Sequence, residues 1–91
     1  MRIIILYQPN SEYARVMEEY AHDFTRQQGI TISIELVSLD TRDGASMASL
    51  YDVVQYPAIV VTAENGSILK FWQGPDETPP LMTELAAYAR G

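Results

Sequence analysis

The sequence predicts an α/β fold in which a mixed four-stranded sheet is flanked by helices. Short runs rich in β-branched residues alternate with stretches whose apolar residues recur at helical spacing. The last two predicted strands are joined by Asn65-Gly66, a dipeptide typical of a tight hairpin, so they should pair antiparallel. The predicted order is β-α-β-α-β-β-α, and its opening strand-helix-strand unit calls for a right-handed parallel pair.

The N-terminal third of the chain predicts a central strand followed by an amphipathic helix. Residues 3–7 form an unbroken apolar run, which is typical of a strand buried on both faces. Asn10 or Ser11 is expected to cap the helix that follows, and Gly29 is expected to end it. The apolar stripe of this helix consists of Tyr13, Val16, Met17, Tyr20 and Phe24.

The middle of the chain predicts an edge strand and a shorter helix. Apolar and polar residues alternate over 30–36, as in a half-exposed strand at the edge of a sheet. After a polar connection, residues 45–53 are predicted to form a helix. Its inward-facing residues are expected to be Met47, Leu50 and Tyr51.

The C-terminal part predicts a hairpin and a final helix. The β-branched run 58–62 follows Tyr56-Pro57, and a proline is tolerated at the start of a strand. Residues 68–72 return as its partner. The last helix is predicted over 81–89, after a pair of prolines suited to a first helical turn. Its apolar stripe is expected to be Leu81, Leu85 and Tyr88.

Composition narrows the classes of function. The 91 residues predict one domain, 1–91. They include 6 basic and 12 acidic side chains, a net charge of −6 that argues against nucleic acid or an anionic membrane as partner. There is no cysteine and one histidine, His22, so we expect no metal site and no cofactor. No signal peptide or membrane span is recognisable, and a cytoplasmic location is the expectation.

Three groups of residues resemble the thioredoxin-like fold in its small, glutaredoxin-like form. The first is a strand that ends in Leu6-Tyr7, followed by a short loop and a helix. The second is Val54-Gln55-Tyr56-Pro57-Ala58-Ile59-Val60, which is similar to the family's valine and proline signature before a strand. The third is Asn65-Gly66 followed by Phe71-Trp72-Gln73-Gly74. The resemblance covers the whole chain and implies a cis peptide bond before Pro57.

The chain departs from this family at its redox motif. The family carries Cys-x-x-Cys at the start of the first helix, and the equivalent stretch here is Pro9-Asn10-Ser11-Glu12-Tyr13. A thiolate is the nucleophile of thiol–disulfide exchange, so this chain alone has no residue for that reaction. We therefore predict no catalytic residue. Ser11 is read as a helix cap because the only histidine, about three helical turns further on, lies too far away to act as its base.

The resemblance implies a binding surface that needs no thiol. In the family, the residue before the proline offers its backbone to an extended peptide, here Tyr56 beside Pro57. Asn10 and Ser11 would add backbone N–H donors from the start of the first helix. These four residues are the candidate site. The predicted function is a non-redox protein- or peptide-binding module, acting as a monomer or weak homodimer.

Two other functions stay open at this level. A small-ligand carrier or non-thiol enzyme would need convergent polar groups near Ser11 and Tyr56. A regulatory interaction protein is the second alternative, because Pro9-Asn10-Ser11 resembles a short stretch of the KaiB clock family. That family is also thioredoxin-like, similar in length, and lacks a working Cys-x-x-Cys.

Overall fold

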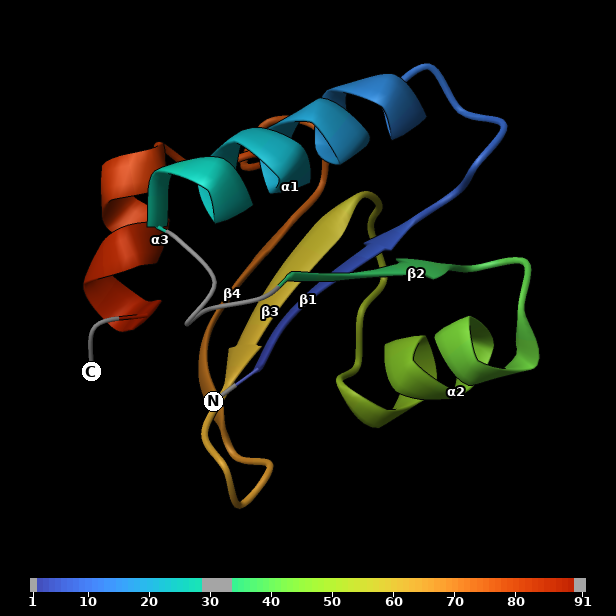
Figure 1. Ribbon diagram of the computed structural model, residues 1–91. Coiled ribbons are helices and arrows are strands. Elements are labelled where there is room, and N and C mark those ends of the chain that lie inside the picture. Colours follow the sequence, from blue (N-terminus) through green and yellow to red (C-terminus); the bar gives the residue numbers. More distant parts are fainter. Residues whose placement is uncertain (1, 29–33, 90–91) are drawn as a thin grey trace.

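The structure is a computed structural model that describes residues 2–28 and 34–89. Its helices flank a four-stranded sheet (Figure 1). The strands lie in the order β2-β1-β3-β4. β1 pairs parallel with β2 and antiparallel with β3, and β3 pairs antiparallel with β4. The predicted mixed sheet and element order are therefore confirmed. The elements are β1 (Arg2–Tyr7), α1 (Ala14–Gln28), β2 (Ile34–Ser38), α2 (Arg42–Leu50), β3 (Ala58–Thr62), β4 (Ile68–Gln73) and α3 (Met82–Ala89).

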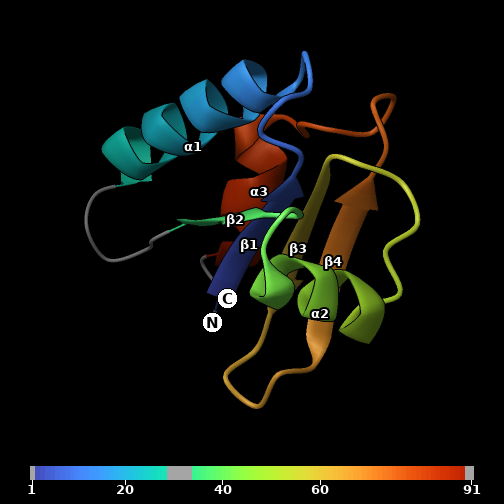
Figure 2. The same cartoon turned by 90° about the vertical axis from the view of Figure 1, so that its right-hand side faces the viewer.

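The helices divide the core into two layers. α1 and α3 cover one face of the sheet and α2 covers the other (Figures 1 and 2). Because successive side chains of a strand point to opposite faces, β1 sends Ile3 and Ile5 to the first layer and Ile4 and Leu6 to the second. All four are fully buried. This is why the predicted central strand is an unbroken apolar run.

The first helix begins later than predicted. α1 starts at Ala14, and residues 8–11 form a turn in which the backbone N–H and the hydroxyl of Ser11 both donate to the Gln8 carbonyl, at 3.0 and 2.8 Å. The prediction that Asn10 or Ser11 caps this helix is wrong, because the helix begins three residues after Ser11 and, among the described residues, no backbone N–H donates to either side chain. The Ser11 N–H is already used within the turn.

The second helix begins earlier than predicted, at Arg42, because Thr41 caps it. The Thr41 Oγ1 atom accepts the backbone N–H of Gly44 at 3.0 Å. The helix ends at Leu50, so the side chain of that residue stands on the last turn with 75% of its surface exposed. The prediction that Leu50 faces inward is wrong, and the buried residues of this helix are Gly44 and Ala48.

Two further stripe residues lie at the surface rather than in the core. Val16 is 46% exposed and Leu81 is 71% exposed, so both predictions are wrong. α3 starts at Met82, one residue after Leu81, and it buries Leu85 and Ala86 instead. β2 is an edge strand, as predicted, although the expected residues 30–33 fall outside the part of the chain that is described.

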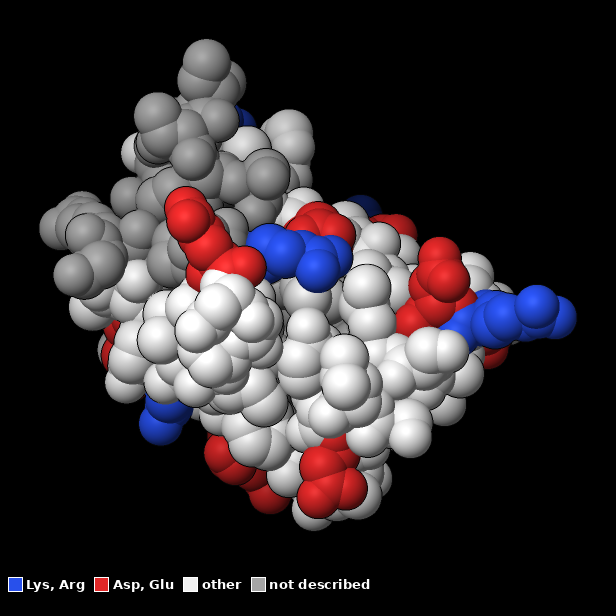
Figure 3. Space-filling model, turned by 90° about the horizontal axis from the view of Figure 1, so that it is seen from below, with Lys and Arg blue, Asp and Glu red and all other residues white. Residues whose placement is uncertain are grey.

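The surface is acidic, and its ion pairs are isolated. Three pairs form among the described residues, and the shortest joins Arg2 to Glu35 at 2.7 Å, across β1 and β2. On the face shown in Figure 3, basic side chains stand apart from one another, several of them beside a carboxylate. None of the described helices combines the length and apolar character needed to cross a membrane.

Candidate functional site

Two loops meet at one end of the sheet and enclose a small cavity. The loop after β1 and the loop before β3 both lie at this end (Figure 2). The cavity has a volume of about 200 Å³. It brings together three of the four predicted site residues, Ser11, Tyr56 and Pro57, whereas Asn10 is exposed outside its lining. The lining consists of Gln8, Ser11, Glu12, Tyr13, Tyr56 and Pro57.

Hydrogen bonds from β4 hold the loop before β3 in place. The Gln73 side-chain carbonyl accepts the backbone N–H groups of Val54 and Gln55, at 3.0 and 3.3 Å. The backbone N–H of Gly74 donates to the Pro57 carbonyl at 2.9 Å. The Tyr56–Pro57 peptide bond between these anchors is cis, as the resemblance implied.

Tyr56 is the residue of this loop whose backbone stays open. Its N–H and C=O take part in no hydrogen bond within the described part of the chain. Its ring packs against the core layer under α2, and its hydroxyl is 3.5 Å from the Val53 carbonyl, at the outer limit for a hydrogen bond. Tyr56 therefore presents a held but unpaired stretch of backbone beside the cavity.

Sequence reasoning missed a buried threonine behind the site. The Thr78 hydroxyl donates to the Gly74 carbonyl at 2.6 Å and lies 3.4 Å from the Pro57 carbonyl. This side chain is only 8% exposed, and its peptide bond to Pro79 is also cis. A threonine before two prolines reads as a loop residue, and only the tertiary contact between the loops shows that it supports Pro57.

The chemistry that the cavity offers is hydrogen bonding and aromatic contact. Its ionisable side chains are the carboxyl group of Glu12 and the phenols of Tyr13 and Tyr56. The Ser11 hydroxyl is directed to a backbone carbonyl, and His22 is exposed on α1, outside the lining. Among the described residues, no three His, Asp or Glu side chains are grouped closely enough to hold a metal ion.

Tyr7 is the last residue of β1 and lies in the core layer under α1. Its hydroxyl donates to the Glu18 carboxylate at 3.5 Å. Burial, together with that nearby negative charge, raises the pKa of the Tyr7 phenol. Tyr7 is therefore a neutral, buried support between β1 and α1, and it does not line the cavity.

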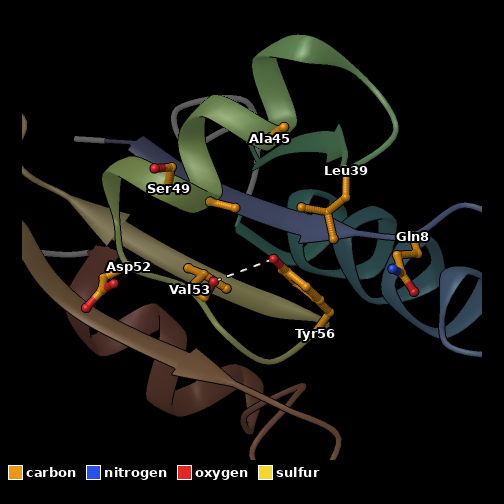
Figure 4. Close-up of a pocket in the computed structure, with 8 residues that line it drawn as sticks. Gln8, Leu39, Ala45, Ser49, Asp52, Val53 and Tyr56 are labelled. Atoms are coloured by element: carbon orange, nitrogen blue, oxygen red, sulfur yellow. Dashed lines mark hydrogen bonds between the residues drawn. The ribbon is translucent and has the colours of Figure 1, made fainter.

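A second, larger cavity lies on the α2 side of Tyr56 (Figure 4). Its volume is about 440 Å³, and it shares Gln8 and Tyr56 with the first cavity. Sequence reasoning missed it because the residues that line it come from four separate segments. They are Gln8, Leu39, Ala45, Ala48, Ser49, Asp52, Val53 and Tyr56.

No family model matches the sequence, and no curated protein matches it. Solved structures do match. Thioredoxin 1 from the thermophilic eubacterium Thermosipho africanus is similar with a TM-score of 0.74 at 12% identity, over 99% of this chain and 96% of that one. The first two thioredoxin domains of Saccharomyces cerevisiae Eps1p give 0.62 at 21% identity, over 98% of this chain and 33% of that one.

Thioredoxin-2 of a malaria parasite, described as a component of its protein secretion machinery, gives a TM-score of 0.62 at 21% identity, over 94% of this chain and 82% of that one. At these identities the similarity concerns the fold. All three neighbours are thioredoxins or thioredoxin domains, whereas this sequence contains no cysteine. The chain therefore has the thioredoxin-like fold without the Cys-x-x-Cys motif.

Proposed function

We propose that this chain is a non-redox peptide-binding module that pairs an extended segment of a partner protein with the backbone of Tyr56. The observation that carries the proposal is the open N–H and C=O of Tyr56, which lie beside a cavity of about 200 Å³. Backbone pairing of this kind supplies affinity through main-chain hydrogen bonds and needs no reactive side chain.

The surroundings of Tyr56 favour an extended peptide as the ligand. The Val54 and Gln55 N–H groups are already bonded to Gln73, so the loop is held before a partner arrives. A preorganised edge reduces the conformational entropy that is lost on binding. Tyr13 and Tyr56 both line the cavity, and tyrosine combines apolar area with a polar group that suits an interface.

Selection of peptides from a phage-displayed library of short random linear sequences, with the wild-type chain as bait, tests the proposal. Enriched peptides are then titrated against the wild type, Tyr56→Ala and Tyr51→Ala. Tyr51 is the matched control because its ring packs against the same core layer but lines neither cavity. We expect Tyr56→Ala to weaken binding about tenfold or more and Tyr51→Ala to change it by less than about twofold.

Circular dichroism of both variants shows whether each remains folded. Tyr56→Ala keeps the backbone N–H and C=O, so binding that it leaves unchanged would show that the ring is not part of the peptide site. A peptide that leaves the Tyr56 amide unshifted in an NMR titration of the wild type would place the peptide elsewhere and reject this function. A wild-type chain that enriches no sequence above an unrelated bait would reject it as well.

A further inference from the structure

The proposed function does not yet use the cavity on the α2 side of Tyr56. It adjoins the open backbone of Tyr56, because that residue lines both cavities. In Figure 4, Gln8 and Asp52 stand at opposite ends of its lining, with Val53 and Tyr56 between them. Its volume of about 440 Å³ is in the range of ligand pockets. A peptide paired with Tyr56 would therefore pass beside a space large enough for one of its side chains.

The charged side chains that line this cavity are negative only. Asp52 is the only carboxylate in the lining, and neither Lys nor Arg contributes to it. Among the described residues, the Asp52 carboxylate takes part in no ion pair and no hydrogen bond. The Asp52 side chain is exposed to water, so a cation brought to this end of the cavity would meet a hydrated carboxylate with no basic side chain of the described residues paired to it.

The end of α2 adds to this negative potential. The carbonyl end of a helix carries a partial negative charge, and the last turn of α2 has no basic residue to balance it. Tyr51 caps the end of the helix, and Asp52 comes next, in the left-handed region with φ 58°, which aspartate tolerates better than most residues. The Asp52 N–H donates to the Ser49 carbonyl at 3.2 Å and the Val53 N–H to the Ala48 carbonyl at 2.9 Å, so the turn is closed.

One wall of the lining is suited to an aliphatic stem, while Gln8 and Ser49 make other parts of it polar. Ala48 and Val53 are buried in the core layer under α2, and the Tyr56 ring packs against the same layer. Lysine and arginine place their methylene groups along such surfaces and keep the charged end in a polar setting. The combination of an apolar wall and a lone carboxylate matches these side chains better than it matches neutral or acidic ones.

We propose that this α2-side cavity, lined by Val53, Tyr56 and Asp52, receives a lysine or arginine side chain of the peptide that pairs with Tyr56. The inference rests on the proposed function and names the class of partner: an extended peptide with a basic residue beside the pairing position. It also gives a role to Asp52, which the sequence did not single out.

Three synthetic peptides test the inference, each of the form acetyl-Thr-Val-X-Val-Thr-amide, with lysine, norleucine or glutamate at X. Norleucine is an uncharged counterpart of the lysine stem. Binding to the full chain is followed by NMR titration of backbone amides at low salt. Asp52→Asn removes the charge and keeps a residue that tolerates positive φ. Glu64→Gln removes a charge in the β3–β4 turn, at the opposite end of the sheet, and is the matched control.

We expect the lysine peptide to bind the wild type about threefold more tightly than the norleucine peptide, with the glutamate peptide weakest. Asp52→Asn should abolish the lysine preference, Glu64→Gln should retain it, and added salt should reduce it. Equal binding of the lysine and norleucine peptides, with shifts at the Tyr56 amide, would overturn the cation pocket but keep the proposed function. A preference that survives in Asp52→Asn would do the same. Peptides that leave the Tyr56 amide unshifted would overturn both.

Discussion

The side-chain carbonyl of Gln73 accepts the backbone N–H of Val54 at 3.0 Å, across 19 residues of chain. The same oxygen also accepts the N–H of Gln55 at 3.3 Å. Because these two donors are satisfied by β4, the first open N–H of the loop is that of Tyr56. One side chain on an edge strand therefore decides which N–H groups of the loop are bonded and which stay unpaired.

Replacement of Gln73 by methionine should loosen this loop. Methionine has a similar length but offers no carbonyl oxygen, so Val54 and Gln55 lose their acceptor. We expect a loss of about 1 kcal/mol in the free energy of unfolding and faster hydrogen exchange at residues 54–56. Urea denaturation and amide exchange measure the two effects. Gln73→Glu keeps an acceptor oxygen and should preserve slow exchange, and equal exchange in both variants would contradict this role.

Replacement of Thr78 by valine tests the support behind Pro57. Valine keeps the branched shape but removes the hydroxyl that donates to the Gly74 carbonyl at 2.6 Å. That carbonyl retains the Thr78 N–H at 3.1 Å, so we expect a moderate loss of about 1 kcal/mol in unfolding free energy. Thr78→Ser keeps the hydroxyl and is the control. If denaturation shows the valine variant to be as stable as the wild type, the hydroxyl contributes nothing.

Replacement of Tyr20 by phenylalanine should stabilise the protein at neutral pH. The Tyr20 hydroxyl is buried and has no hydrogen-bond partner among the described residues. An unpaired buried hydroxyl has lost its hydrogen bonds to water, and its removal should raise the free energy of unfolding by about 1 kcal/mol. Thermal and urea denaturation measure this change. A less stable variant would show that the hydroxyl has a partner in solution.

The same residue predicts how stability changes in alkali. Burial, and to a lesser degree the charge of Glu84, raises the pKa of Tyr20 to about 12, whereas an unfolded tyrosine titrates near 10. Between these values the unfolded chain releases the proton more readily than the folded one, so stability falls as pH rises. Below the unfolded pKa this contribution is fully present. The fall above pH ~10 should be shallower in Tyr20→Phe than in the wild type.

Replacement of Gly44 by alanine tests whether helix propensity or packing has the larger effect on stability at this position. Alanine in α2 would be favoured by about 1 kcal/mol on propensity alone. A Cβ atom at this position would overlap the Ser38 carbonyl and lie 3.1 Å from the Leu39 Cα, and both neighbours are backbone atoms. We expect packing to win, with a net loss of about 1 to 3 kcal/mol in unfolding free energy.

Ala45→Gly, on the exposed neighbour of Gly44, calibrates this result in the same helix. It should cost about 1 kcal/mol through propensity alone. An unchanged or increased stability of Gly44→Ala in urea denaturation would show that Ser38 moves aside without cost.

Some elements of this fold could be predicted from local sequence. These are the strand that is buried on both faces and the turns whose residues allow one geometry. The run 3–7 predicted a central strand because both of its faces had to be covered, and Asn65-Gly66 predicted the hairpin. The valine and proline signature around Tyr56-Pro57 predicted the loop before β3. These features depend on residues that are close together in the chain, so they can be recognised in the sequence.

The helix faces and boundaries depended on tertiary packing. An apolar stripe at helical spacing says that a helix has an inner face, but Leu50, Val16 and Leu81 show that it does not fix how far that face extends. Val16 lies in the first turn of α1, Leu50 is the last residue of α2, and Leu81 precedes α3, so all three are near helix ends, and all three are exposed. The Ser11 turn is similar, because a serine near a helix start reads as a cap whether or not its hydroxyl is used elsewhere.

Residue types and short-range patterns were enough to predict the order of elements, the parallel first pair, the antiparallel hairpin and the lack of a thiol for redox chemistry. The antiparallel pairing of β1 with β3 was not predicted, because it joins strands that are far apart in the chain. The surroundings of Tyr56 could not be predicted in this way, because they are formed by residues from several segments. Gln73, Thr78 and Asp52 lie on three different segments, and each looks like an ordinary surface or loop residue in the sequence. The hydrogen bonds of Gln73 and Thr78 and the cavity beside Asp52 form where distant segments meet, since they depend on positions in space rather than on spacing along the chain.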